Sequence, residues 1–420
     1  MQEKEKAVLA GANINNQSDF GRLMEELGNL AAACDMEVTA LCVQNLKSAN
    51  RAYCMGAGKV EELKAMVKDL EAEVVVFNNE LTPSQQRNLE KELECRIIDR
   101  TGLILEIFAK RAKTREAKLQ VEVALLQYMQ TRLIGSNEDL GRQTGGVGTK
   151  NRGAGETKLE LDRRKIGERI AELSRELELV SRERRIQRRK RDRSELPKVV
   201  LVGYTNAGKS TLMNAMVELY KKSGDKKVFE KDMLFATLDT SVRSIVLPDN
   251  RAFLLADTVG FVSRLPHSLI RAFRSTLEEV VEADLLLHVV DFSSESYSRQ
   301  IDVTMDTLKQ IGAGDIQVIH VYNKADLTAT AIPFAEDGKV YISAKKRIGI
   351  EELVNQIRQA VFKQYVNCRM LIPYDQGRIT AYLNENAQVR SVSYEKEGAL
   401  LELECRESDY QRLKRFVYSA

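Results

Sequence analysis

The segment that most limits the fold of this chain is a glycine-rich octapeptide, GYTNAGKS, at residues 203–210. It matches the pattern G-x-x-x-x-G-K-[ST] at every position. A short apolar run at 199–202 precedes it and a helical stretch at 211–219 follows. Because a phosphate-binding loop joins a strand to a helix in this way, we expect an α/β fold here. The expected sheet is mainly parallel, with helices on both faces.

The octapeptide also predicts contacts with a nucleoside triphosphate. Its glycines let backbone N–H groups turn toward the phosphates, and the following helix N-terminus adds a favourable field. Lys209 is expected to reach the β and γ oxygens, while the Ser210 hydroxyl is offered to Mg²⁺. The predicted phosphate-binding residues are Gly203, Tyr204, Thr205, Asn206, Ala207, Gly208, Lys209, Ser210 and Thr211.

A second motif, NKAD at residues 323–326, follows an expected strand at 318–321 and indicates the base. A carboxylate at Asp326 can accept hydrogen bonds from N1–H and the 2-amino group of guanine, and adenine lacks that pair of donors. A short motif after 340–342 is expected to close over the base through its backbone. The predicted base-binding residues are Asn323, Lys324, Asp326, Ser343, Ala344 and Lys345.

Two further segments are expected to sense the terminal phosphate. In DTVG, which follows an expected strand at 252–255, Asp257 lies near Mg²⁺ and the Gly260 N–H faces the γ-phosphate. In FATLD, Thr237 supplies a second hydroxyl to Mg²⁺. The predicted metal ligands are therefore Ser210, Thr237 and Asp257, and the predicted catalytic residues are Lys209, Thr237 and Gly260.

Hydrolysis is expected to be slow in the isolated protein. Many switch GTPases place a glutamine directly after this glycine to orient water, but Phe261 stands there and has no hydrogen-bonding group. An external contact would then supply positioning or charge. Asn206 is a candidate for holding K⁺ beside the phosphates; the alternative is a simple hydrogen bond within the loop.

Short β-rich runs alternate with helical stretches before residue 113. The runs at 8–12, 38–43, 74–77 and 96–99 predict a mainly parallel sheet covered by helices. Thr82 and Pro83 are typical of a helix start. A second glycine-lysine segment, GAGK at 56–59, fails as a phosphate loop because it lacks the first glycine and the final hydroxyl residue.

The pattern then becomes purely helical. Apolar residues recur along one face of 119–133, and a heptad seam runs through 166–180, so we expect a helical hairpin. The connecting segment, 140–157, is rich in glycine and basic residues, and residues 182–193 contain eight basic and two acidic side chains. Both segments are interpreted either as solvated connectors or as contacts to a phosphate backbone.

Four parts are predicted for a chain of 420 residues. They are an α/β domain at 1–113, a helical arm at 114–195 with its tip at 140–157, a nucleotide-binding domain at 196–365, and a small α+β domain at 366–420. Apolar runs are too short to span a membrane and the first residues do not form a secretory signal, so a cytoplasmic location is expected. The protein is also expected to be a monomer.

Several stretches together resemble the HflX family of translation-factor-related GTPases. They include residues 98–128, GAGETKLELDRR at 153–164, and 257–291, where Phe261 fits the hydrophobic residue of that family. The resemblance implies binding of the large ribosomal subunit and rRNA in the GTP state, and splitting of stalled or stress-damaged ribosomes. It also implies that the tip reaches toward the peptidyl-transferase region. The sequence departs from the family pattern at 240–243, and the segment after 370 has counterparts in only some members.

Three other functions fit parts of the sequence. A ribosome-assembly GTPase would leave precursor subunits to accumulate on depletion. A regulatory module that binds a protein partner would tolerate loss of the basic side chains. An ATP-driven RNA-remodelling activity of the first domain has only the incomplete loop at 56–59 in support.

Overall fold

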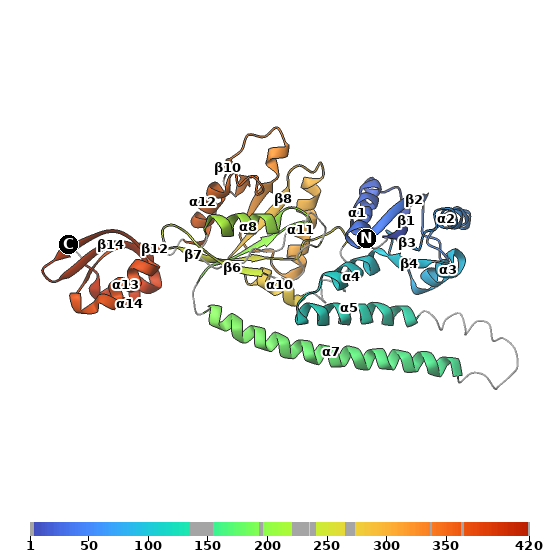
Figure 1. The fold of residues 1–420 in the computed structure, drawn as a ribbon, viewed down its shortest axis with the longest axis horizontal. Coiled ribbons are helices and arrows are strands. Elements are labelled where there is room, and N and C mark those ends of the chain that lie inside the picture. The colour runs from blue at the N-terminus through green and yellow to red at the C-terminus, as the bar shows by residue number, and fades with distance from the viewer. Residues whose placement is uncertain are drawn as a thin grey trace. The chain divides into compact units, whose positions relative to one another are not determined.

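The computed structural model describes residues 4–134, 154–192, 196–220, 235, 241–264, 274–336, 338–362 and 365–418. These form two compact units, drawn in Figure 1. The first consists of Met1–Arg189, Lys231–Asp239 and Val262–Thr276, and the second holds the rest of the chain. Within the described residues, no helix has both the length and the apolar character that crossing a membrane requires.

The first unit is built on a parallel four-stranded sheet in the order β2-β1-β3-β4. Its strands are β1 (Glu5–Ile14), β2 (Met36–Leu46), β3 (Val74–Phe77) and β4 (Arg96–Asp99). The predicted runs are confirmed, and β3 and β4 have the predicted bounds. Strands β1 and β2 extend beyond the apolar runs because they pair with each other along their whole length, which the local pattern does not reveal.

Helices cover both faces of this sheet. They are α1 (Phe20–Ala33), α2 (Ala57–Asp69), α3 (Pro83–Leu93) and α4 (Arg100–Arg111). Helix α1 packs with α4, and α2 packs with α3. The predicted start of α3 is confirmed by a capping box, in which the Thr82 hydroxyl accepts from the Gln85 N–H and the Gln85 side chain accepts from the Thr82 N–H.

The predicted helical hairpin is formed by α5 (Arg115–Ile134) and α7 (Ala154–Asp192), which lie side by side in Figure 1. The apolar face of α5 and the heptad seam of α7 pack together in one cluster. It consists of Leu119, Val123, Leu126, Ile170, Leu173, Leu177 and Val180. An ion pair of 3.0 Å between Arg169 and Glu122 also joins the helices.

Two predicted basic segments are only partly described. Residues 140–153 of the predicted tip lie outside the described residues, whereas 154–157 form the first turn of α7. The basic run at 182–193 is predicted to lie beside the helical arm. In the structure its residues up to Asp192 are part of helix α7 itself.

The second unit contains a sheet with seven strands among the described residues, in the order β10-β11-β9-β8-β5-β7-β6. These are β5 (Lys198–Val202), β6 (Ser241–Val246), β7 (Ala252–Asp257), β8 (Leu285–Asp291), β9 (Val318–Asn323), β10 (Phe334–Glu336) and β11 (Lys339–Tyr341). All neighbours are parallel except at the two edges, where β6 and β10 run antiparallel. The predicted mainly parallel α/β fold is confirmed.

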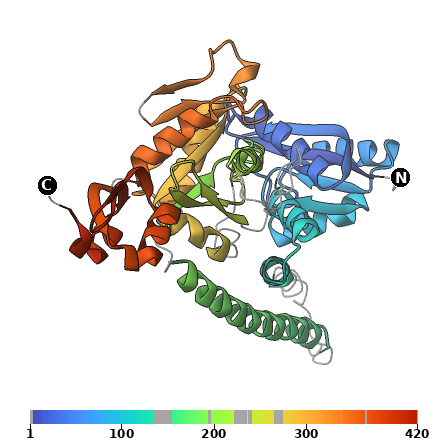
Figure 2. The same cartoon turned by 60° about the vertical axis from the view of Figure 1, so that its left-hand side comes forward.

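This sheet is covered by α8 (Lys209–Leu219), α10 (Arg274–Val281), α11 (Tyr297–Ile311) and α12 (Ile350–Val361). Residues 285–290 of β8 are all buried, so both faces of the sheet centre are covered. Figure 2 shows the helices around these strands from a second direction. One large core joins the strands to α8 and α12.

The last segment forms a separate antiparallel sheet in the order β12-β14-β13. It consists of β12 (Tyr365–Ile372), β13 (Gln388–Glu395) and β14 (Gly398–Arg406), with α13 (Gly377–Asn386) and α14 (Glu407–Arg412). Its apolar core includes Met370, Leu383 and Leu401. The α+β character is as predicted, while the four-part division of the chain stays a prediction.

Candidate nucleotide-binding site

The loop between β5 and α8 depends on two glycines. Gly203 has φ of +143°, and a Cβ there would lie 2.2 Å from the Val289 carbonyl oxygen. Gly208 has φ of +93°, and a Cβ there would lie 2.2 Å from Asn323 Nδ2. Both positions exclude a side chain by backbone conformation and by space. Helix α8 begins at Lys209, two residues before the predicted start, so its first N–H groups belong to the loop.

The Lys209 side chain is folded back over this loop. Its Nζ donates to the carbonyl oxygens of Gly203 at 3.1 Å and Tyr204 at 2.9 Å. The residue is buried, and desolvation lowers the pKa of its ammonium group to about 8, against a smaller opposing effect of Asp257. A phosphate anion placed beside Nζ would favour the charged form that burial disfavours.

Two oxygen-bearing side chains meet at the end of β7. The Ser210 Oγ donates to Asp257 Oδ2 over 2.6 Å, and Asp257 is completely buried. Hard oxygen ligands of this kind suit Mg²⁺, which takes few protein ligands and keeps several waters. Thr237, the other predicted metal ligand, lies outside the described residues.

The residue that follows DTVG, Phe261, is hydrogen-bonded to the phosphate loop. The Phe261 N–H donates to the Gly203 oxygen at 3.1 Å, and the Thr205 N–H donates to the Phe261 oxygen at 2.8 Å. At Gly260 a Cβ would approach Thr205 Cα to 2.8 Å and Lys209 Nζ to 2.9 Å. Glycine is therefore required for this close approach, and the buried Phe261 ring brings no hydrogen-bonding group to it.

Asn323 connects the two base-binding motifs to the phosphate loop. Its Nδ2 donates to the Ala207 oxygen at 2.9 Å, and its Oδ1 accepts from the Ala344 N–H at 2.9 Å. The side chain is buried and uses both ends of its amide. The sequence placed Asn323 in the NKAD motif without revealing this bridging function, which depends on segments far apart in the chain.

The remaining motif residues have partners that no local pattern in the sequence indicates. Lys324 Nζ lies 2.8 Å from Asp291 Oδ2, and Lys346 Nζ lies 3.1 Å from Asp326 Oδ2. A hydrogen bond from Ser343, followed by the Lys346 ammonium, lowers the pKa of the Asp326 carboxyl. The position of Asp291 could have indicated this contact with Lys324, because Asp291 is the last residue of β8 and β8 is the neighbour of the strand that leads into NKAD.

The predicted residues of the described part therefore converge at the carboxyl ends of neighbouring strands. Tyr204 and Thr211 are half-buried, Lys345 is exposed, and Thr205, Ala207, Ser343 and Ala344 are buried. Asn206 is exposed with φ of +61°, a conformation that asparagine tolerates. Its predicted contact with K⁺ stays a prediction.

The GAGK segment at 56–59 is built differently. Gly56 precedes α2 with φ of −68°, and its N–H donates to Gln44 Oε1 at 2.8 Å. The Lys59 ammonium pairs with Glu62, one turn further along the same helix. These partners occupy the groups that a phosphate loop would offer, in agreement with the prediction that the segment is not one.

Three family models match the chain. They are described as GTP-binding GTPase N-terminal, over residues 22–109, GTP-binding GTPase middle region, over 111–191, and 50S ribosome-binding GTPase, over 198–324. The last model ends within the NKAD motif and contains the whole phosphate loop.

Curated relatives match over nearly the whole chain. GTPase HflX of Caldanaerobacter subterraneus is 43% identical over 417 residues, which cover 99% of this chain and 95% of the relative. GTPase HflX of Escherichia coli K12 is 37% identical over 416 residues, with 97% and 95% covered. Among solved structures, a GTP-binding protein from Sulfolobus solfataricus in complex with GDP is 23% identical with a TM-score of 0.44, covering 85% of this chain and 99% of that one.

Proposed function

We propose a function from one established premise: the chain belongs to the HflX family of GTPases, binds GTP and GDP, and hydrolyses GTP. We infer that the GTP-bound protein binds the large ribosomal subunit in the cytoplasm and separates stalled or stress-damaged ribosomes. The observation that carries this proposal is the match of the nucleotide-binding unit to a 50S ribosome-binding GTPase model. The protein would act as a monomer.

In this proposal the phosphate loop holds the triphosphate through its backbone N–H groups, and Lys209 neutralises the β and γ oxygens. On binding, Lys209 would exchange two carbonyl partners for phosphate oxygens. Ser210 and Asp257, with Thr237, would hold Mg²⁺, which supplies charge neutralisation between the β- and γ-phosphates. Asp326 would accept hydrogen bonds from guanine. Asn323 would hold the base-binding and phosphate-binding loops together through its bonds to Ala344 and Ala207.

The γ-phosphate would control the DTVG segment through Gly260. The next residue, Phe261, shares two backbone hydrogen bonds with the phosphate loop, so a shift of Gly260 on binding the phosphate would be passed to Phe261 and the loop. Since Phe261 cannot orient water, intrinsic hydrolysis is slow, and the ribosome would accelerate it. K⁺ at Asn206 would add positive charge; equal turnover in matched KCl and NaCl would contradict this part.

The helical hairpin would carry the ribosome contact. Helices α5 and α7 are joined by an apolar seam and cross-helix ion pairs, which makes them a stiff support. The basic residues between and after them would contact rRNA phosphates, whose neutralisation supplies much of the affinity for nucleic acid.

Two variants test the proposal. Lys209→Ala should abolish nucleotide-dependent co-sedimentation with large subunits, and unaltered GTP-stimulated binding of this variant would contradict the mechanism. Removal of residues 141–155 should spare GTP binding and weaken splitting of ribosomes into subunits, measured by gradient sedimentation. Full-rate splitting by the deletion variant would show that the tip is only a spacer.

A further inference from the structure

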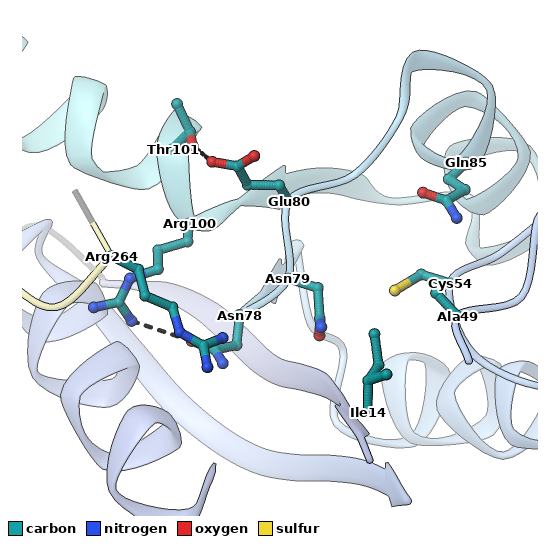
Figure 3. A pocket seen from close by; sticks show the side chains of 10 residues that line it. All are labelled: Ile14, Ala49, Cys54, Asn78, Asn79, Glu80, Gln85, Arg100, Thr101 and Arg264. Carbon is teal, nitrogen blue, oxygen red and sulfur yellow. Dashed lines mark hydrogen bonds between the residues drawn. The ribbon is translucent and has the colours of Figure 1, made fainter. Parts of the chain in front are cut away.

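A cavity of about 290 Å³ lies in the first unit, at the carboxyl ends of its strands. It is lined by Ile14 at the end of β1, by Asn78, Asn79 and Glu80 after β3, and by Arg100 at the start of α4. Figure 3 shows these side chains together with Arg264, which belongs to the same unit. None of these residues belongs to the nucleotide-binding site described above.

The sheet topology explains why a cavity forms at this place. Strand β1 leads through α1 to β2 on one side, whereas β3, its other neighbour, leads through α3 to β4 on the opposite side. Helices α1 and α3 lie on different faces, since α1 packs with α4 and α3 with α2. The segments after β1 and β3 therefore diverge, and such switch points are where open parallel sheets bind ligands.

Two buried side chains of the cavity wall carry unused hydrogen-bond donors. Asn78 is 2% exposed and Arg100 is 3% exposed. Arg100 Nη1 donates to Asn78 Oδ1 at 3.1 Å, which fixes the orientation of the amide because an arginine can only donate. Asn78 Nδ2 and Arg100 Nε then have no partner among the described residues. Buried polar groups are rarely left unpaired, so these donors indicate a missing acceptor.

Other polar side chains described in the wall already have partners. Both ends of the Asn79 amide are occupied by the Ala12 backbone, at 2.8 and 3.0 Å. Arg100 also pairs with Glu26 at 2.9 Å, so its charge is partly balanced. Arg264 donates to the neutral Gln17 and adds a further positive charge at the exposed side of the cavity. Glu80 is the one carboxylate among the described lining residues; it is exposed and accepts from Thr101.

We propose that this cavity binds the phosphate group of a small phosphorylated molecule. Unused donors on Asn78 and Arg100, with the Arg264 charge, fit an oxyanion rather than a cation or a neutral donor. The volume is at the lower end for small-molecule sites, which are roughly 300–1,000 Å³. Among the described residues that line the cavity none is aromatic, so this part of the wall offers no ring on which a base could stack. A sugar phosphate fits these features better than a nucleotide.

The test measures binding to the full-length protein by calorimetry, with the GTP site saturated by GDP and Mg²⁺ so that the phosphate loop cannot take the added anion. Inorganic phosphate and ribose 5-phosphate are the probes, and ribose is the control without phosphate. We expect saturable binding of one phosphate-bearing probe per chain and no binding of ribose. Absence of saturable binding by both phosphate probes would overturn the proposal.

Substitutions locate the site. Asn78→Asp keeps the oxygen that accepts from Arg100 but replaces the unused donor with a negative charge, so affinity should fall at least about tenfold. Asn45→Asp makes the same change on an exposed residue of β2 outside the cavity wall and should leave affinity within about twofold. Equal affinities of the two variants would contradict the assignment.

Because a buried charge at residue 78 can impair folding, Arg264→Gln provides an independent test at an exposed position. It removes one positive charge from the cavity and should weaken phosphate binding about threefold or more. Unchanged affinity in this variant, with Asn78→Asp unfolded, would overturn the proposal.

Discussion

Two glycine-lysine segments lead into helices of this chain, GAGK at the start of α2 and GYTNAGKS at the start of α8, yet only the second forms a phosphate loop. In the second, Gly208 has φ of +93° and Lys209 is buried over the loop carbonyls. In the first, Gly56 has φ of −68° and Lys59 pairs with Glu62 along its own helix. The phosphate loop is therefore distinguished by a backbone that turns at positive φ and by a buried lysine whose ammonium group donates to loop carbonyls, whereas the lysine of the first segment is paired with a carboxylate on its own helix.

The largest effect is expected from removal of the lysine in each segment. Lys209→Ala should weaken GDP binding by about 100-fold, because charge-assisted hydrogen bonds to phosphate contribute roughly 1.5–3 kcal/mol. Lys59→Ala should change it by less than about twofold, since Lys59 belongs to an exposed ion pair. Fluorescence titration with a labelled GDP measures both. Similar losses in the two variants would remove the distinction between the segments.

A smaller effect is expected from a methyl group at Gly208. Gly208→Ala combines a positive φ with a close approach to Asn323 Nδ2 and should lower the free energy of unfolding by about 2 kcal/mol. It should also weaken GDP binding, because Asn323 bridges the loop to Ala344. Urea denaturation with and without GDP checks this, and wild-type stability would show that the loop is not under this constraint.

The affinity for GDP should depend on pH through the buried Lys209. In the free protein Lys209 is charged below about pH 8 and neutral above it, whereas bound phosphate favours the charged form. Affinity for GDP should therefore be constant below this pH and fall above it, by about tenfold between pH 7 and 9. Lys209→Ala should remove this dependence. An unchanged slope in that variant would assign the titration to another group.

The smallest effect is expected at Gly58, in the first turn of α2. A Cβ there meets nothing within 4 Å, and the position has ordinary helical geometry. Gly58→Ala should raise the free energy of unfolding by roughly 0.5 kcal/mol, since alanine favours the helix, and should leave GDP binding unchanged. Destabilisation, measured by urea denaturation, would mean that this glycine is constrained as Gly208 is.

Local patterns predicted much of the fold. The bounds of β3 and β4, the start of α3 and the facing apolar ladders of α5 and α7 follow from strand alternation, a capping box and helical periodicity. The start of α7 at Ala154 was missed because glycine-rich composition favours a loop, whereas the structure continues the helix into that segment.

Contacts between distant segments were less predictable. The motifs identified the phosphate loop, Asp257 and NKAD. They did not indicate that Asn323 bridges Ala207 and Ala344, because Ala207 lies more than a hundred positions before Asn323 in the chain. The pairs of Lys324 with Asp291 and of Asp326 with Lys346 also depend on strand order. The cavity at Asn78 and Arg100 has no local motif, since strand order alone brings β1 and β3 together.

In the proposed function, the terminal phosphate of GTP controls binding to the large ribosomal subunit. Equilibrium binding of the wild-type protein to purified large subunits should be compared in the nucleotide-free, GDP-bound and non-hydrolysable GTP-analogue-bound states. We expect clearly tighter binding with the analogue than in the other two states. Equal affinity in all three states would contradict it.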